Sequence, residues 1–350
     1  MSASAPPPAP LGLPPAASVD PGAFARDRAT VFAHAWLCLG ASAEWPVAGA
    51  AAARDQGGRS IVALRHTDGG LRAFANVCPH RAGPLLWPGE DRPAGQGLRC
   101  RYHGWRFDQD GALVGTPDFD GQRVGASALA AGCRLSPLPT AEAAGLVWVW
   151  LGTGAPDRPA PGAAGPLAGA LAALGLDRWR PRARASHPLA CDWKVYVENY
   201  LEGYHIPYLH PGLGREIDMG GYAVEVDGDT VRHVVPTRPG AVNEGLWLWV
   251  WPNLAINVYG GACSIERMLP LGPGAARIDY VYLADDSVSD DAFAEMLRTS
   301  ATTTAEDVRI VEQVQRGLHD PAAAAGPLSP RHEAGLAHFH ALLRAAWGGG

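Results

Sequence analysis

The chain has 350 residues, 47% of them hydrophobic, so it is long and apolar enough for two domains with ample cores. Its formal net charge is −6, which argues against a basic surface for nucleic acid or an anionic membrane. No apolar run reaches transmembrane length, so no membrane-spanning helix is predicted and a cytoplasmic protein is expected.

The N-terminal region shows a Pro/Ala-rich segment followed by a helix signal. Residues 1–19 lack the basic and apolar regions of a signal peptide, so a disordered leader is expected. Asp20 and Pro21 predict the start of a helix, with Asp20 as N-cap, that runs to about Trp36.

The domain boundaries are predicted from changes in composition. A Pro/Gly/Ala-rich stretch at 154–184 has no strand pattern and is expected to be a linker with one short helix. We therefore expect the N-terminal helix and a first domain at 20–153, closing with a strand at 146–151, and a second domain at 185–345.

Two cysteines and two histidines form the first motif. Cys78-Pro-His80 is followed, after residues 81–99, by Cys100-Arg-Tyr-His103. A Rieske [2Fe–2S] cluster holds one iron with two thiolates and the other with two imidazoles. The motif supplies both pairs, with Cys78 and Cys100 on one iron and His80 and His103 on the other.

The surrounding strand signals agree with this interpretation, and the spacing of the motif argues against a zinc site. Predicted strands at 61–64 and 71–74 flank the Asp68-Gly69-Gly70 turn, and 105–107 precedes the Asp110-Gly111 turn, so each arm is expected at a hairpin tip. A Cys₂His₂ zinc site uses the same residue types. However, zinc fingers favour C-x₂₋₄-C and H-x₃₋₅-H pairs, not C-x-H with C-x-x-H.

The second motif holds two histidines five residues apart, His205 and His210. On a regular helix they would point about 140° apart. Pro207 lies between them, so the helix must end or kink there, and both imidazoles can then converge. Two histidines and one carboxylate leave open positions on Fe(II) for O₂.

The third ligand is expected from a predicted helix at 304–318. Asp307 lies in register with an apolar stripe on this helix, where a carboxylate is costly unless it is paired or bound to a metal. Glu306 is one position off the stripe, so Asp307 is the predicted ligand. The apolar members of the stripe are Ile310, Val311, Val314 and Leu318.

These segments resemble a known family. Residues 100–105 (CRYHGW) and 191–213 (CDWKVYVENYLEGYHIPYLHPGL) resemble Rieske non-heme iron oxygenase alpha subunits of the ring-hydroxylating oxygenase superfamily. The resemblance covers nearly all of 20–345 and is greatest to the choline, glycine-betaine and carnitine monooxygenases. Respiratory Rieske proteins carry an extra disulfide-forming Cys beside each pair, which Ala82, Gly83 and Tyr102 do not provide.

The resemblance implies an α+β fold, with an all-β Rieske domain followed by a helix-grip domain, an antiparallel sheet around a long helix. It implies that His205 and His210 bind iron, that residues 306–318 bear the third ligand, and that Glu202 is a carboxylate bridging the two metal sites. It also implies a homotrimer, in which the cluster of one subunit docks against the iron of its neighbour. Predicted catalytic-domain strands lie at 222–226, 230–235, 246–251, 254–259, 263–269 and 277–283.

Aromatic residues near the second motif suggest a substrate pocket. Alternate residues of one predicted strand point to the same face, and rings on that face could bind a quaternary ammonium by cation–π attraction. The alternative is a Trp-rich strand that fills the core of the sheet. The candidate cage residues are Tyr204, Tyr208, Trp247, Trp249, Trp251 and Tyr259.

The leading functional hypothesis is a terminal oxygenase that uses the cluster, Fe(II) and O₂ to hydroxylate or oxidatively N-demethylate a small substrate such as a quaternary amine. Monooxygenation is favoured over dioxygenation. No plant-type ferredoxin motif or G-x-G-x-x-G fingerprint is present, so electrons from NAD(P)H are expected only through a separate flavin- or ferredoxin-type reductase.

Two alternatives stay open. One is an aromatic-ring-hydroxylating or O-demethylating oxygenase with the same metals. The other is a Rieske electron-transfer protein, against which the segment 199–210 argues, because a carrier needs no second metal.

Overall fold

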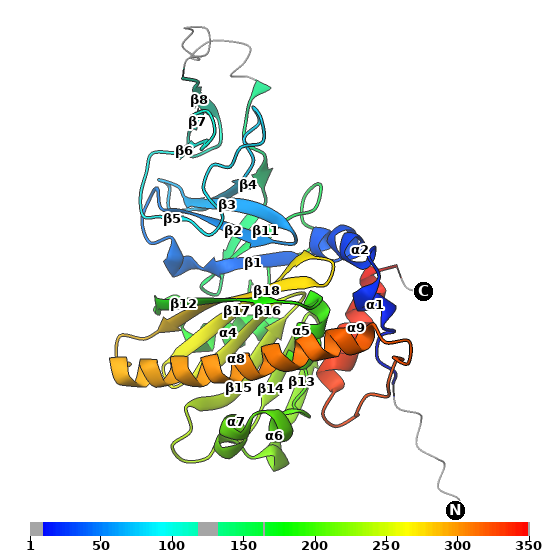
Figure 1. The fold of residues 1–350 in the computed structure, drawn as a ribbon. Coiled ribbons are helices and arrows are strands. Elements are labelled where there is room, and N and C mark those ends of the chain that lie inside the picture. The colour runs from blue at the N-terminus through cyan, green and yellow to red at the C-terminus, as the bar shows by residue number, and fades with distance from the viewer. Residues whose placement is uncertain (1–9, 118–131, 164, 349–350) are drawn as a thin grey trace, which may run out of the picture. The chain divides into compact units, whose positions relative to one another are not determined.

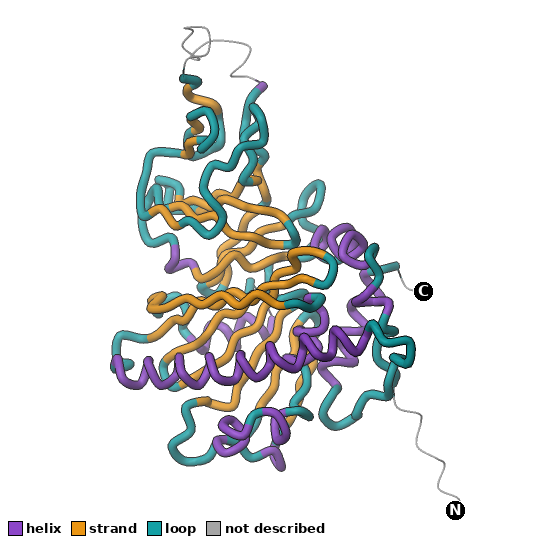
Figure 2. The backbone as a smooth tube through the Cα atoms, viewed as in Figure 1, coloured by secondary structure: helices purple, strands orange, loops and turns teal. Residues whose placement is uncertain are grey.

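The computed structural model describes residues 10–117, 132–163 and 165–348. They form two compact units, the smaller comprising Phe32–Pro181 and the larger comprising Met1–Val31 with Arg182–Gly350. The predicted α+β class, an all-β domain followed by an antiparallel sheet with a long helix, is confirmed (Figure 2). Within the described ranges, no helix is both long and apolar enough to cross a membrane.

The described residues of the smaller unit form three sheets. Its sheet orders are β1-β11-β10, β5-β2-β3-β4-β9 and β6-β7-β8. The β2–β3 hairpin turns on Gly57 and Gly58, which both adopt positive φ and so suit a two-residue turn. The strands are β1 (Trp36–Ala41), β2 (Ala51–Gln56), β3 (Arg59–Arg65), β4 (Leu71–Ala75), β5 (Asp91–Arg92), β6 (Leu98–Arg99), β7 (Arg106–Phe107), β8 (Leu113–Gly115), β9 (Pro137–Leu138), β10 (Thr140–Ala143) and β11 (Leu146–Trp150).

The larger unit centres on a seven-stranded sheet with the order β12-β18-β17-β16-β15-β14-β13. From β13 to β18, consecutive strands pair antiparallel, and the predicted turn at Asp227-Gly228 joins the first two. The strands are β12 (Arg180–Leu189), β13 (Ala223–Asp227), β14 (Thr230–Val234), β15 (Asn243–Val250), β16 (Leu254–Tyr259), β17 (Ala262–Gly272) and β18 (Ala275–Ala284).

A long helix, α8 (Asp290–Leu318), crosses a face of this sheet together with α5 (Trp193–Tyr200) (Figure 1). Ser289 caps its N-terminus by accepting a hydrogen bond from the Ala292 N–H at 3.2 Å. The helix therefore begins well before the predicted start at 304. Its buried side chains recur every three or four residues: Phe293, Met296, Ser300, Thr304, Asp307, Val311 and Gln315.

The predicted stripe on this helix needs correction at two positions. Asp307 and Val311 are buried, but Ile310 and Val314 are 37% and 43% exposed. The buried face centres near Val311, and at 3.6 residues per turn Ile310 lies about 100° from it. Tertiary packing, not the local apolar pattern, selects the face.

The N-terminal segment also differs from the prediction. Asp20 ends α1 (Ala16–Val19) instead of starting a helix, and α2 (Ala23–Thr30) stops before Trp36, which begins β1. Part of the predicted disordered leader is thus helical, while residues 1–9 lie outside the described residues. The segment groups with the larger unit, because the buried Asp27 carboxylate accepts hydrogen bonds from Trp193 and Lys194 of α5.

The other helices in the described part of the chain are all shorter than α8. Helix α4 (Gly165–Leu174) is the one expected in the predicted linker, whose last residues belong to β12. Helices α6 (Ile206–Leu209) and α7 (Pro211–Glu216) follow α5, and α9 (Ala334–Ala346) packs beside β13.

Candidate metal centres

Two loops of the smaller unit carry the Cys/His motif. The β6–β7 hairpin presents Cys100 and His103 at its tip, as predicted. The C-x-H arm is not at a hairpin tip, because β4 leads to β5, which pairs with β2 elsewhere in the sheet. This arm folds as its own tight loop, in which the Cys78 N–H donates to the Gly83 carbonyl at 2.8 Å.

The four side chains of the motif converge. The two histidine rings lie 4.7 Å apart between centroids, and His80 stacks on Trp105 at 4.6 Å. Both cysteines are buried in the core of the unit. Burial, with a contribution from Cys100, raises the pKa of the Cys78 thiol to about 11, so a cation is needed to hold it as thiolate.

The site fits the expected cluster on two further observations. Nδ1 of His80 is buried and has no hydrogen-bond partner among the described residues, so it is available as a ligand atom. A Cβ at Gly83 would lie 3.1 Å from the Cys100 sulfur and 2.7 Å from Tyr102, so only glycine leaves this side of the cysteine open. Iron bound by these four side chains would satisfy both features.

The second centre is formed by the chain that follows α5 and by the side of α8 that faces it. His205 precedes α6 and His210 follows it, so a single helical turn separates the two histidines. Pro207 lies in the first turn of α6, where its missing N–H costs little. The proline therefore begins a new helix instead of ending the first one, which stopped at Tyr200.

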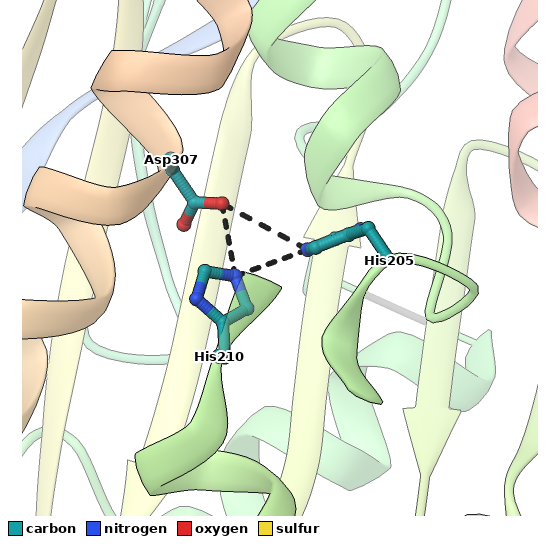
Figure 3. Close-up of side chains that lie close together, drawn as sticks. All are labelled: His205, His210 and Asp307. Atoms are coloured by element: carbon teal, nitrogen blue, oxygen red, sulfur yellow. Dashed lines mark hydrogen bonds and ion pairs between the residues drawn. The ribbon is translucent and has the colours of Figure 1, made fainter. Parts of the chain in front are cut away.

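Three donor atoms meet at this point (Figure 3). His205 Nε2 lies 3.1 Å from His210 Nε2, and Asp307 Oδ1 lies 3.0 Å from His210 Nε2 and 3.8 Å from His205 Nε2. One ligand atom from each residue falls within 4.8 Å of the others. This is the donor set of a 2-His-1-carboxylate metal face.

The outer ring nitrogens show why a cation fits. His205 Nδ1 contacts Glu202 Oε1, and His210 Nδ1 lies 2.7 Å from Glu306 Oε2. A carboxylate accepts the ring N–H, which leaves both Nε2 lone pairs directed at one another. That arrangement is favourable when a metal ion lies between them.

The carboxylates also act on the acid–base properties of the site. Although burial lowers the pKa of His210, hydrogen bonds and charge interactions with Asp307 and Glu306 raise it above its ordinary value overall. Asp307 Oδ1 also accepts a hydrogen bond from Asn199 Nδ2 at 2.7 Å. Asp307 is therefore placed inside the cluster, and Glu306 lies behind His210.

A cavity of about 100 Å³ adjoins these three residues. Two of the predicted cage residues, Trp247 and Tyr259, line it. The other aromatic residues were not predicted, although Tyr196 and Tyr200 lie one helical turn apart on α5. The aromatic lining consists of Tyr196, Tyr200, Tyr222, Trp247, Tyr259 and Tyr280.

Four predicted cage positions are corrected. Trp249 and Trp251 pack on Phe339 of α9, with ring centroids 5.5 and 6.0 Å away, and so belong to the core. Tyr204 and Tyr208 are 53% and 84% exposed and do not line the cavity, because the chain turns outward between the two histidines.

Glu266, a buried acid that lines the cavity from β17, was also not predicted from the sequence. Its signal was a pair of adjacent charges, Glu266 and Arg267, inside a run that is otherwise apolar except for Ser264. Such a pattern indicates a buried charge that needs a partner.

Comparison with known families is consistent with both centres. Residues 35–128 match the family model of the Rieske [2Fe-2S] domain, and residues 176–349 match that of the ring hydroxylating alpha subunit (catalytic domain). The chloroplastic choline monooxygenase of Arabidopsis thaliana is 30% identical, over 93% of this chain and 80% of its own. The carnitine monooxygenase oxygenase subunit of Escherichia coli K12 is 28% identical, over 93% of this chain and 90% of its own.

Solved structures share the fold. The quaternary ammonium Rieske monooxygenase CntA, in complex with L-carnitine, superposes with a TM-score of 0.84 at 24% identity, covering 97% of this chain and 96% of its own. Naphthalene 1,2-dioxygenase from Rhodococcus sp. gives 0.78 at 20% identity, covering 96% and 94%.

Proposed function

Since the chain belongs to the Rieske-type ring-hydroxylating oxygenase alpha subunits, we propose that this terminal oxygenase component oxidises an N-methyl group of a small quaternary amine. The names of its relatives support the substrate class, because they act on choline and carnitine. The aromatic lining of the cavity beside the His/His/Asp cluster supports it independently. That cavity is the observation that carries the proposal.

We assign the metal ligands by residue. In the smaller unit, proposed as the Rieske domain, Cys78, His80, Cys100 and His103 would hold the [2Fe–2S] cluster. In the larger, catalytic unit His205, His210 and Asp307 would hold Fe(II). When bound, the cluster supplies single electrons and the Fe(II) supplies open coordination positions for O₂.

The other residues of the site orient these ligands. Glu202 and Glu306 accept the outer N–H groups of the histidines and fix the ring orientations. Asn199 holds the carboxylate of Asp307. The tyrosines and Trp247 line the cavity and would face the methyl groups of the amine.

Alpha subunits of this family receive electrons from a separate electron-transfer partner. We propose a flavin- or ferredoxin-type reductase as that partner and a homotrimer as the assembly, with Glu202 carrying electron transfer between His205 and the His103 of a neighbouring copy. Glu202→Gln should keep both metals yet slow oxidation of the reduced cluster by O₂ in stopped-flow experiments with substrate present. A wild-type rate would remove Glu202 from this role.

One experiment separates the functional classes. The reconstituted protein should contain about three irons per chain, whereas a Rieske electron carrier would contain about two. With a reductase, choline, betaine, carnitine, proline betaine and simple aromatics are compared for coupled O₂ uptake. Uptake with an amine, together with formaldehyde release or a hydroxylated amine, is expected. Uptake with aromatics alone would overturn the proposal.

A further inference from the structure

Among the described acids that line the cavity, Glu266 alone neither belongs to the metal cluster nor contacts one of its histidines. Of the other acids in the lining, Glu202 is bonded to His205 and Asp307 belongs to the metal cluster. Glu266 is 2% exposed and projects from β17, between Ala255 on β16 and Tyr280 on β18 in register. A carboxylate at such a position needs a compensating partner.

The hydrogen bonds around Glu266 leave one of its oxygens unused. Tyr200 donates its hydroxyl to Asn257 Oδ1 at 2.9 Å, which fixes the Asn257 amide so that Nδ2 reaches Glu266 Oε2 at 3.3 Å. Oε1 is buried and has no hydrogen-bond partner within the described part of the chain. The Asn257 amide thus holds Oε2, and the nearby hydroxyls of Tyr196 and Tyr280 stabilise the carboxylate without supplying a counter-charge.

The described lining supplies no permanent cation. Among the described residues that line the cavity, none is Arg or Lys. His233 also lines it, but burial lowers the pKa of this histidine to about 4, so it is neutral. Burial raises the pKa of Glu266 to about 7, although the hydroxyls of Tyr196 and Tyr280 oppose this rise. A bound cation would restore the charged form.

The shape and chemistry of the lining indicate what that cation is. Six aromatic rings line the same cavity, and such rings attract an alkylated ammonium through their faces. A quaternary ammonium has no N–H to donate, so it needs a charge and aromatic faces instead of hydrogen-bond acceptors. Glu266 and the rings provide both.

We propose that Glu266 is the counter-ion for the ammonium group of the substrate, and that the cavity selects amines with a permanent positive charge and no carboxylate. A substrate carboxylate would enter a lining whose described residues include three acids and no Arg or Lys. This inference rests on the proposed function, because it names the residue and the charge type that define the amine.

The test measures anaerobic binding by calorimetry, so that no turnover occurs. Three probes are titrated into the metal-loaded protein: choline, its uncharged carbon analogue 3,3-dimethylbutan-1-ol, and glycine betaine, which replaces the alcohol of choline with a carboxylate. The wild-type protein should prefer choline to each of the others by about tenfold or more. Equal affinity for choline and the uncharged analogue would overturn the proposal without any variant.

The variants identify the residue. Glu266→Gln keeps the shape and removes the charge, and it should abolish most of the preference for choline over 3,3-dimethylbutan-1-ol while iron content stays at wild-type level. Glu225→Gln is the control, since Glu225 is exposed on β13 and pairs with Arg232. Glu266→Asp keeps the charge and should keep part of the preference. An unchanged preference in Glu266→Gln contradicts the proposal.

The outcome also separates this inference from the proposed function. If the wild-type protein oxidises a quaternary amine but Glu266→Gln discriminates charge as well as wild type, only the role of Glu266 fails. If the wild-type protein oxidises aromatics and binds none of the amines, the proposed function fails with it. Stronger binding of betaine than choline overturns the selectivity part of the inference.

Discussion

Removing the carboxylate of Glu306 tests whether the two adjacent acids on α8 have different roles. We assign Asp307 as a metal ligand and Glu306 as the group that orients His210. Its Oε2 lies 2.7 Å from His210 Nδ1, and the side chain is 31% exposed. Loss of a carboxylate that orients a ligating histidine typically weakens metal binding by about 10–100-fold, or roughly 1.4–2.7 kcal/mol. Partial exposure to water screens this interaction, so Glu306→Ala should weaken Fe(II) binding by about tenfold, near the lower end of that range.

Asp307→Ala should behave differently. This change removes a donor atom of the cluster and leaves the Asn199 amide, now 2.7 Å from Oδ1, without its acceptor. We expect the mononuclear iron to be lost and turnover to stop. Glu306→Gln should recover most of the affinity lost in Glu306→Ala, because an amide oxygen still accepts the His210 N–H.

The assay is anaerobic Fe(II) binding in competition with a chelator, with iron counted per chain after gel filtration. The Rieske visible spectrum is an internal control, since its proposed ligands lie in the other unit. Glu295→Ala provides a matched control on the same helix, where Glu295 is exposed and pairs with Arg298. If Asp307→Ala retained iron and activity while Glu306→Ala lost both, the ligand assignment would be wrong.

Three further predictions concern the other parts of the chain. Cys78→Ser or His103→Ala should remove the [2Fe–2S] visible and EPR signature from a folded protein, and an unchanged spectrum in both would contradict the ligand set. Lys194, the only lysine, is fully buried against Asp27, so Lys194→Met should cost about 3–5 kcal/mol in urea unfolding; a loss below about 1 kcal/mol would mean that this ion pair is not structurally important. Burial lowers the pKa of His233 from 6.5 to about 4, so its contribution to stability is complete above pH 6.5 and up to about 3 kcal/mol is lost as pH falls toward 4. His233→Asn should therefore lose less stability than wild type between pH 7 and 4.5, measured by thermal unfolding, and parallel pH curves would refute the reasoning.

Much of the fold was predictable because strand patterns and turns are local. Predicted strands at 230–235 and 254–259 coincide closely with β14 and β16, since apolar runs and an Asp-Gly turn define them without reference to distant residues. The N-terminal helix was predicted poorly. Asp20 is a good N-cap by type, yet it ends α1, and the contacts of Asp27 with α5 that hold the segment are not local.

The residue types of both centres and their spacing within each motif were determined by the sequence alone. The donor atoms in each motif predict its metal centre. This holds for the C-x-H with the C-x-x-H, and for the two histidines around a proline. Tyr196, Glu266 and Glu306 show what only the tertiary structure decided. Each lies on a helix or strand whose orientation depends on how α5 and α8 cross the sheet. Tyr196 and Glu266 thereby meet at the cavity, and Glu306 lies behind His210. Helical or strand periodicity predicts which residues share one face of an element. Long-range packing then selects which of those faces lines the site.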